Sequence, residues 1–442
     1  MVRLYDDLKR KIESREITAG VVGLGYVGLP LAMAYVAAGY KVLGYDVDAA
    51  KVAKLAAGRS YVGDVGDAEL AAARGAGRFD ATTDVRRLAE ADVISICVPT
   101  PLTAAKEPDM SYLLDTALAL APHLRRGRLV IVESTVYAGA TREDVLPLLE
   151  KGSALKAGAD FWLAFSPERV DPGNKDYPLR KIPTVVGGVD AAAGELAALF
   201  YGPVVSEVVK VSSAEAAEMS KLLENTYRAV NIALVNELKI ICHRMGLDVF
   251  EVIAAAATKP YGFQRFLPGP GVGGHCIPLD PYYLAWRARK FGRESRFVEL
   301  AGEVNDAMPG YVVDRLAEAL AARGSRLEGA RVLVLGVAYK PDVDDLRESP
   351  ALEILDLLRE RGAVVAYHDP YAPVLPRVRK HDLGLSSVSL SAAEVGKYDA
   401  VVIATDHTAV DYGMVFAAAP LVVDTRGVAR RLGLGGANVV SA

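Results

Sequence analysis

The chain has 442 residues, of which 51% are hydrophobic and 24% charged, and its formal net charge at pH 7 is −4. A chain of this length exceeds one ordinary core and predicts two or three globular domains. A pI near 6.0 excludes the basic surface that binds nucleic acid or an anionic membrane. No apolar run reaches the roughly 18 residues of a membrane span, and the first residues lack a signal-peptide core, so we expect a cytoplasmic protein.

Short β-branched runs alternate with alanine-rich segments from Ile17 to about Val209, which predicts βαβ units. A helix is expected over Leu29–Ala38. These features favour a doubly wound parallel-sheet domain. The expected strands are Thr18–Gly23, Lys41–Asp46, Val93–Val98, Leu129–Glu133, Trp162–Phe165, Thr184–Gly187 and Val204–Val209.

The segment from Ser212 to about Met245 contains neither glycine nor proline. Its apolar residues recur at helical spacing, which predicts one helix with a length on the order of 50 Å. A helix of that length can connect two domains and offer a surface to a second subunit.

The strand–helix alternation returns at Arg331, which predicts a second, smaller parallel-sheet domain. The fold class is therefore α/β, with two Rossmann-like domains joined by a central helical domain, and the expected boundaries are 1–211, 212–325 and 326–442. In the last domain we expect strands Val332–Val337, Val364–His368, Ala400–Ala404 and Leu421–Asp424 and a helix over Ala351–Arg361.

A glycine triplet, Gly23, Gly25 and Gly28, follows the first expected strand and opens a helix. Gly23 permits the tight turn, Gly25 lets the backbone approach a pyrophosphate, and Gly28 allows the helix to pack on the strand. Asp46 ends the next strand, where a carboxylate accepts hydrogen bonds from ribose hydroxyls and repels a 2′-phosphate. This combination predicts NAD rather than NADP, although the glycines alone would also fit a packed βα turn.

Lys221, Asn225 and Arg228 lie four and seven residues apart on the long helix and share a face. Three polar side chains on one face can contact a single ligand. The alternative interpretation is a solvated stripe, as on most charged helix faces.

The run from Pro268 to Gly274 is too rich in glycine and proline for a helix or strand, and it is followed by Cys276. Such a loop exposes backbone N–H groups to a ligand. Most free cysteines are inert and buried, but this one follows the loop and precedes Asp280. A thiol can trap an aldehyde, so we interpret Cys276 as a nucleophile in an oxidation that passes through a thioester. Cys97 and Cys242 lie far away in sequence, and this spacing predicts neither a disulfide framework nor a metal site.

Further polar residues follow expected strands. Ser134 and Thr135 follow one strand, and the run Ser166–Arg169 follows another. Glu168 in that run fits a structural cap as well as a functional carboxylate. Lys340 and Arg347 lie in an acid-rich loop of the last domain and form either a positioned network or surface charges.

Taken together, the chain resembles the nucleotide-sugar 6-dehydrogenases of the UDP-glucose/GDP-mannose dehydrogenase superfamily, and the resemblance runs from Gly23 to Asp424. It implies an NAD-binding, a central helical and a UDP-binding domain. The motifs that carry it are Gly23-Leu24-Gly25-Tyr26-Val27-Gly28-Leu29-Pro30, Lys221-Leu222-Leu223-Glu224-Asn225, Gly273-Gly274-His275-Cys276-Ile277-Pro278-Leu279-Asp280 and Asp345-Leu346-Arg347-Glu348-Ser349-Pro350.

Within the superfamily, the runs 165–169 and 274–278 resemble the branch that acts on UDP-N-acetylhexosamines. The run Ala257–Phe263 is most similar to UDP-N-acetylglucosamine 6-dehydrogenases. The alternatives are UDP-N-acetylmannosamine and UDP-glucose as substrates.

The resemblance implies a four-electron oxidation of C6 in which Cys276 forms a thiohemiacetal and then a thioester. Lys221 takes part in proton transfer and, with Asn225, stabilises the oxyanion. Asp280 and Glu168 are the candidate bases, with their division of work open, and Thr135 positions water.

The resemblance also implies ligand contacts and a homodimer, because the loop that carries Arg265 reaches the neighbouring subunit in related enzymes. The implied NAD contacts are Gly23, Gly25, Tyr26, Val27, Gly28, Asp46, Thr100, Thr135 and Arg347. The implied UDP-sugar contacts are Glu168, Arg169, Val170, Lys221, Asn225, Arg228, Arg265, Gly273 and Lys340.

Two rival functions share much of this pattern. A two-electron alcohol or hydroxyacid dehydrogenase would need the glycine motif but no thiol at Cys276. A non-catalytic sensor of NAD and UDP-sugar would keep both sheets and tolerate loss of the thiol.

Overall fold

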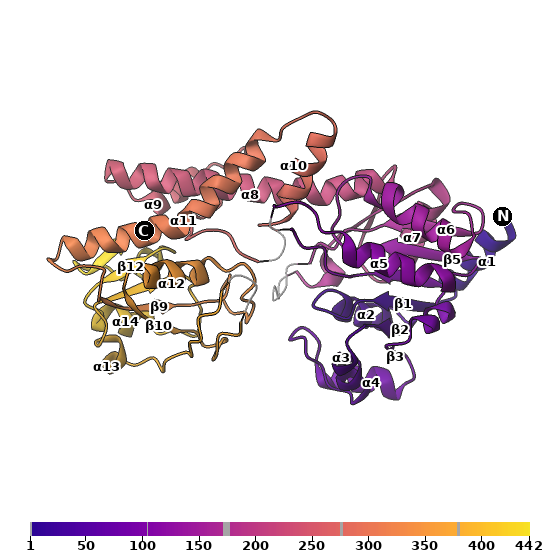
Figure 1. The fold of residues 1–442 in the computed structure, drawn as a ribbon, viewed down its shortest axis with the longest axis horizontal. Helices are drawn as coiled ribbons and strands as arrows, with labels where there is room; N and C mark the ends of the chain where they lie inside the picture. Colours follow the sequence, from indigo (N-terminus) through magenta and orange to yellow (C-terminus); the bar gives the residue numbers. More distant parts are fainter. Residues whose placement is uncertain (1, 104, 171–176, 275–276, 378–380) are drawn as a thin grey trace. The chain divides into compact units, whose positions relative to one another are not determined.

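The computed structural model describes residues 2–103, 105–170, 177–274, 277–377 and 381–442 (Figure 1). The chain forms two compact units. The first comprises Met1–Glu224 with Trp286–Arg293, and the second comprises Asn225–Ala285 with Glu294–Ala442. The three-domain division at 211 and 325 remains a prediction.

The first unit contains an eight-stranded sheet with the order β3-β2-β1-β4-β5-β6-β7-β8. Its first six strands follow the 3-2-1-4-5-6 order of dinucleotide-binding folds, which confirms the expected doubly wound domain. The strands are β1 Thr18–Val22, β2 Lys41–Tyr45, β3 Phe79–Thr82, β4 Val93–Ile96, β5 Arg128–Val132, β6 Phe161–Phe165, β7 Thr184–Gly188 and β8 Val208–Lys210.

Three features of this sheet differ from the sequence prediction. Strand β3 was not expected, because its four residues include Asp80 and show no β-branched run. Strands β6 and β7 pair antiparallel, whereas the other pairs are parallel. Strand β8 begins at Val208 rather than Val204, because the amides of Val204 and Val205 donate to the Tyr201 carbonyl in a turn.

Helices cover both faces of this sheet, as the burial of every residue in β4 and β6 requires (Figure 1). On one face, side chains of α1, α2 and α7 pack with alternate strand residues in a single hydrophobic cluster. The helices of the unit are α1 Val2–Glu13, α2 Gly28–Ala37, α3 Ala49–Ala56, α4 Asp67–Gly75, α5 Ser111–Leu120, α6 Leu146–Ser153 and α7 Ala191–Tyr201.

The second unit contains a five-stranded parallel sheet with the order β10-β9-β11-β12-β13. This is the 2-1-3-4-5 order, so the two sheets share an architecture but not a strand order. The sequence analysis missed β13. The elements are β9 Arg331–Leu335, α12 Pro350–Glu360, β10 Val364–His368, α13 Ala392–Val395, β11 Ala400–Ile403, α14 Tyr412–Ala418, β12 Val422–Asp424, α15 Val428–Leu432 and β13 Val439–Ser441.

The expected long helix is α8, Ala214–Met245, with 32 residues. The hydroxyl of Ser213 accepts from the Ala216 amide and caps its first turn, and Gly246, with φ +70°, ends it. The helix contributes residues to both units. The remaining helices are α9 Val249–Ala256, α10 Asp280–Lys290 and α11 Arg296–Ala321.

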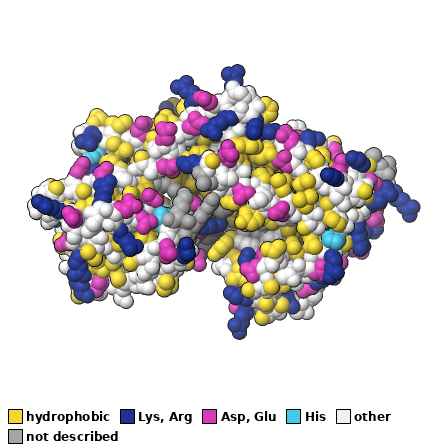
Figure 2. Space-filling model, viewed as in Figure 1, with side chains coloured by type: hydrophobic (Ala, Val, Ile, Leu, Met, Phe, Trp, Pro, Cys, Tyr) yellow, Lys and Arg dark blue, Asp and Glu magenta, His cyan; other side chains and the backbone are white. Residues whose placement is uncertain are grey.

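Lys and Arg side chains are interspersed with Asp and Glu on the face shown in Figure 2. This mixture agrees with the small net charge of −4. Among the described residues, no helix has the length and apolar character needed to cross a bilayer.

We predict that Gly28→Ala destabilises the first unit. A Cβ at Gly28 would lie 1.8 Å from the carbonyl oxygen of Gly23, so the turn after β1 must open. The apparent midpoint of thermal unfolding should fall by roughly 5 °C. Gly25→Ala is the matched control, because a Cβ there meets nothing within 4 Å. Equal midpoints for the two variants would contradict this account.

Candidate functional site

The turn after β1 brings three strands together around its glycines. Gly23 has φ +89°, and a Cβ there would lie 2.6 Å from the Cys97 carbonyl oxygen, next to the end of β4. At Gly25, by contrast, there is open space. The turn therefore offers free backbone at the N-terminus of α2, where a pyrophosphate binds in this kind of fold.

Asp46 follows β2, and its side chain is hydrogen-bonded to the turn after β1. One carboxylate oxygen accepts from the Leu24 amide at 2.9 Å, and the other accepts from the Asp48 amide at 2.9 Å. The side chain is buried, and the ammonium group of Lys51 lies 3.5 Å away. The acid is thus held in place at the sheet edge by backbone amides.

The other residues expected to contact NAD in this unit lie at the same edge, because parallel strands end there together. Tyr26 is exposed and Val27 half-buried before α2, and Thr100 is buried after β4. Thr135 is half-buried after β5. These positions form one continuous edge from β2 to β5.

The loop that follows Thr135 is attached to α8 by Glu218. Its two carboxylate oxygens accept from the amides of Gly139 at 2.5 Å and Thr141 at 2.9 Å. Burial raises the pKa of Glu218 to about 7. The sequence analysis missed this residue, although it lies three residues before Lys221 and seven before Asn225 and therefore shares their face.

Glu168 and Lys221 meet after β6. The ammonium of Lys221 donates to the backbone carbonyl of Glu168, and the Glu168 carboxylate accepts from the Val170 amide at 2.5 Å. Lys221 is buried, and Glu168 is half-buried. A buried cation from α8 is therefore fixed beside the segment that carries a carboxylate.

Arg169 is held by the protein itself. Its guanidinium forms a two-point ion pair with Glu224, at 2.8 and 3.2 Å, and donates to the Pro183 carbonyl at 2.6 Å. This pairing orients the guanidinium and leaves fewer of its donors for a ligand.

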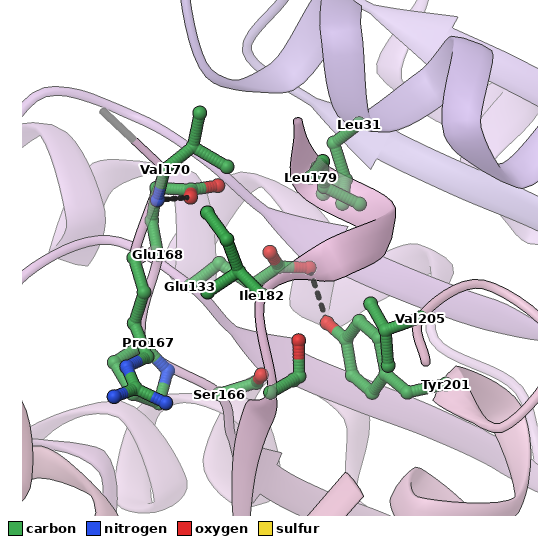
Figure 3. Close-up of a pocket in the computed structure, with 12 residues that line it drawn as sticks. Leu31, Glu133, Ser166, Pro167, Glu168, Val170, Leu179, Ile182, Tyr201 and Val205 are labelled. Atoms are coloured by element: carbon green, nitrogen blue, oxygen red, sulfur yellow. Dashed lines mark hydrogen bonds between the residues drawn. The ribbon is translucent and has the colours of Figure 1, made fainter. Parts of the chain in front are cut away.

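A pocket opens beside Glu168, and a second carboxylate, Glu133, faces it (Figure 3). Glu133 follows β5 directly and was considered in the sequence only as the end of a strand. The pocket is lined by Leu31, Glu133, Ser166, Pro167, Glu168, Arg169, Val170, Leu179, Ile182, Thr184, Tyr201 and Val205.

In the second unit, Asn225 is paired with Asp280. The amide nitrogen of Asn225 donates to the Asp280 carboxylate at 2.5 Å, and both side chains are buried. Asp280 is the first residue of α10, where the helix dipole favours a negative charge. Arg228 and Arg265 are exposed.

The glycine-rich loop is fixed at both ends by hydrogen bonds. The Gly269 amide donates to Asn236 on α8 at 2.9 Å, and the Gly274 amide donates to the Arg347 carbonyl at 2.9 Å. A Cβ at Gly273 would lie 2.7 Å from the Cβ of Tyr339. Close packing thus requires the glycine. His275 and Cys276 lie outside the described residues.

The cations of the last domain are also held by local partners. Arg347 forms a two-point ion pair with Asp345, with a shortest distance of 2.6 Å. The Lys340 ammonium lies 5.6 Å from the ring centre of Tyr339. Arg347 thus has a local ion pair, and a network that joins Arg347 with Lys340 stays a prediction.

A further cation, Arg426, was missed by the sequence analysis. It follows β12, donates to the Ala404 carbonyl at 2.7 Å, and would lie 2.6 Å from a Cβ at Gly269. Nearby, burial lowers the pKa of Lys239 to about 7, and its ammonium donates to the Thr425 carbonyl at 3.2 Å. The available signal was the position of Arg426 two residues after a predicted strand. Within the described residues, no group of three His, Cys, Asp or Glu side chains is arranged to hold a metal ion.

Comparison with known families identifies three consecutive domains. The NAD binding domain of the UDP-glucose/GDP-mannose dehydrogenase family matches residues 17–205. The central domain of the family matches residues 215–307, and its UDP binding domain matches residues 333–431.

Relatives of known activity agree with this assignment. UDP-N-acetyl-D-glucosamine 6-dehydrogenase of Pseudomonas aeruginosa is 38% identical over 89% of this chain and 91% of its own. UDP-N-acetyl-D-mannosamine dehydrogenase of Pyrococcus horikoshii is 39% identical over 88% of each chain. The solved structure of the UDP-D-ManNAc dehydrogenase from P. horikoshii has a TM-score of 0.86 at 34% identity and covers 96% of this chain and 98% of its own. The chain therefore belongs to the UDP-glucose/GDP-mannose dehydrogenase family of NAD-binding nucleotide-sugar dehydrogenases, as the sequence motifs indicated.

Proposed function

We propose that the protein oxidises the C6 hydroxymethyl group of a UDP-N-acetylhexosamine, UDP-N-acetylglucosamine in the first place, to the carboxylate. The observation that carries the proposal is the contact of Lys221 on α8 with the Glu168 carbonyl, which fixes a buried ammonium group beside a carboxylate-bearing segment. Within the second unit, the Asn225 amide donates to the Asp280 carboxylate. An ammonium group, an amide and two carboxyl-bearing segments are the groups that a proton-coupled oxidation of an alcohol needs.

The glycine turn and Asp46 would hold NAD, which when bound would supply the hydride acceptor for each of two oxidations. We assign the chain's own groups as follows. Glu168 or Asp280 removes the proton from the C6 hydroxyl, and Cys276 adds to the resulting aldehyde as a thiolate. Lys221 and Asn225 stabilise the oxyanion, for which one preorganised donor contributes about 3 kcal/mol.

The second oxidation leaves a thioester on Cys276, which water must cleave. A carboxylate takes a proton from the water, and Thr135 orients it. The C–S bond then breaks, so the acid is released and the thiol is regenerated. A working thiol requires a reducing compartment, which makes the cytoplasm the proposed location.

The remaining expected contacts complete the proposed sites. Gly23, Gly25, Tyr26, Val27, Gly28, Asp46, Thr100, Thr135 and Arg347 would contact NAD. Arg169, Val170, Arg228, Arg265, Gly273 and Lys340 would contact the UDP-sugar, with the cations facing its phosphates.

The substrate proposal is tested by a panel of UDP-N-acetylglucosamine, UDP-N-acetylmannosamine and UDP-glucose, followed by NADH absorbance. We expect the highest kcat/KM with UDP-N-acetylglucosamine. A higher value for either other sugar would reassign the substrate within the family. Binding of NAD and all three sugars without turnover would favour the sensor.

The thioester proposal predicts the product of Cys276→Ser. The wild-type enzyme should release two NADH per carboxylate, whereas this variant should form no acid, because an alkoxide leaves an ester less readily than a thiolate leaves a thioester. Cys242→Ala is the matched control, since Cys242 is buried in a separate hydrophobic cluster. Two NADH per sugar from the serine variant would exclude the covalent scheme, and one NADH per sugar from the wild type would favour a two-electron dehydrogenase.

We further propose a homodimer, supported by exposed apolar side chains on α8. Leu223, Tyr227, Leu234 and Ile241 recur at helical spacing and are exposed. Leu234→Glu should lower the mass measured by light scattering from that of two chains to that of one. Leu118→Glu, at an exposed position on α5, should leave it unchanged. A wild-type protein with the mass of one chain would refute the dimer.

A further inference from the structure

A buried polar cluster behind Glu168 has no part in the mechanism above. The hydroxyls of Tyr35 on α2 and Tyr201 on α7 both donate to one oxygen of Glu133, at 2.9 and 2.6 Å. The hydroxyl of Ser95 on β4 lies 2.8 Å from that of Tyr35. All four side chains are buried. Residues of α2 and α7 thus donate to one carboxyl group, and a hydroxyl of β4 adjoins one of these donors.

Glu133 and Glu168 face the same pocket from adjacent strands. Glu133 follows β5 and Glu168 lies just beyond β6, and both line the pocket in Figure 3. Ser166 and Tyr201 contribute hydroxyl groups to the pocket lining, and Arg169 lines the pocket as well. Two carboxyl groups in a partly desolvated space influence each other's ionisation.

The surroundings of Glu133 raise the pKa of its carboxyl group. Burial and the negative charge of Glu168 raise the pKa of Glu133 to about 7, against hydrogen bonds from Tyr201, Ser95 and Tyr35 that lower it. Burial raises the pKa values of Tyr35 and Tyr201 well above the usual value, so both remain hydroxyl donors. The pKa of the Cys97 thiol is raised by burial and by both carboxylates, so it stays neutral.

We propose that Glu133 is a positioning residue that sets the strength of Glu168 as a base through the charges the two groups place in their shared pocket. The inference rests on the proposed role of Glu168. An ionised Glu133 favours proton uptake by Glu168 because the uptake relieves repulsion between like charges. When Glu133 is protonated, this assistance is lost, so catalysis weakens as the pH falls through the titration of Glu133.

The first test is the pH profile of kcat/KM for wild type, Glu133→Gln and Glu133→Asp. The wild type should show an acid limb near pH 7, where Glu133 titrates. Glu133→Gln keeps an acceptor for the tyrosine hydroxyls but carries no charge, so that limb should vanish and the alkaline rate should fall about three- to tenfold. Glu133→Asp restores an ionisable group and should restore a limb. An unchanged profile in Glu133→Gln would overturn the proposal.

The second test removes a hydrogen bond instead of the charge. Tyr201→Phe takes a donor from the ionised carboxylate, so the acid limb should move to higher pH by roughly one unit. Tyr40→Phe is the matched control. Tyr40 is also buried, and its hydroxyl donates to the Phe200 carbonyl rather than to Glu133. Equal shifts in the two variants would show a general packing effect and refute the proposal.

A readout without turnover separates this inference from the proposed function. Infrared difference spectra between pH 6 and pH 8 should show loss of a protonated carboxyl band in the wild type, and the Glu133 contribution should be missing in Glu133→Gln. Glu218, whose pKa is also about 7, contributes to this band in both proteins. If Glu133→Gln loses as much band intensity as the wild type, Glu133 does not titrate in this range and the inference fails. If the band behaves as expected but no UDP-sugar is oxidised, the proposed function fails instead.

Discussion

The arrangement of the candidate site depends on one constraint, the need of buried polar groups on α8 to find partners. A buried charge or amide without a hydrogen bond costs several kcal/mol, so each such residue fixes the helix to a particular segment. Glu218 binds the loop after Thr135, Lys221 binds the Glu168 carbonyl, and Asn225 binds Asp280. Glu218 and Lys221 therefore hold the first part of α8 within the first unit, and Asn225 holds the next part within the second unit.

In the glycine-rich loop, the backbone is likewise held by hydrogen bonds to buried polar side chains. Gly269 donates to Asn236, whose amide in turn donates to Asn305 on α11, so the loop is bonded to two helices through one buried amide. Gly273 packs against the Cβ of Tyr339, and Gly274 packs against its ring. A Cβ at either glycine would lie too close to Tyr339 for any other residue to fit. The glycines of this loop have a packing reason of their own, which is independent of any contact they make with a ligand.

Most of the fold could be predicted from sequence because strand and helix periods are local properties. Most of the strands that were found are apolar and largely buried, as in β1, β4 and β5, and α8 is marked by the absence of glycine between Ser212 and Met245. Strand β3 was missed because its Asp80 and Thr82 break the apolar pattern. The antiparallel pairing of β7 was missed because strand direction depends on the path of the connection, which no local period encodes.

The same distinction between local and tertiary information applies to the residues of the candidate site. Residues in recognisable motifs, such as Gly25, Asp46 and Lys221, could be named from the sequence because their neighbours in the chain identify them. Glu133 and Arg426 could not, since each acquires its partners only through the tertiary structure: Glu133 from hydroxyls on α2 and α7, and Arg426 from the β11 carbonyl edge and the Gly269 loop. A charged residue at the end of a strand is common, and only their tertiary contacts distinguish these two.

The choice between epimeric sugars is a harder problem than the choice of reaction. Oxidation at C6 engages the same kinds of groups whichever way the C2 substituent points, and relatives named for N-acetylglucosamine and N-acetylmannosamine match 89% and 88% of this chain at 38% and 39% identity. Discrimination at C2 requires contacts outside the reacting centre. The segment whose sequence suggested the gluco epimer contains Tyr261 and Phe263, and both are exposed rather than packed within their own unit. The proposed preference for the gluco epimer therefore depends on a segment whose two aromatic side chains are left exposed by their own unit, so its C2 contacts are not defined by the packing that fixes the buried polar residues.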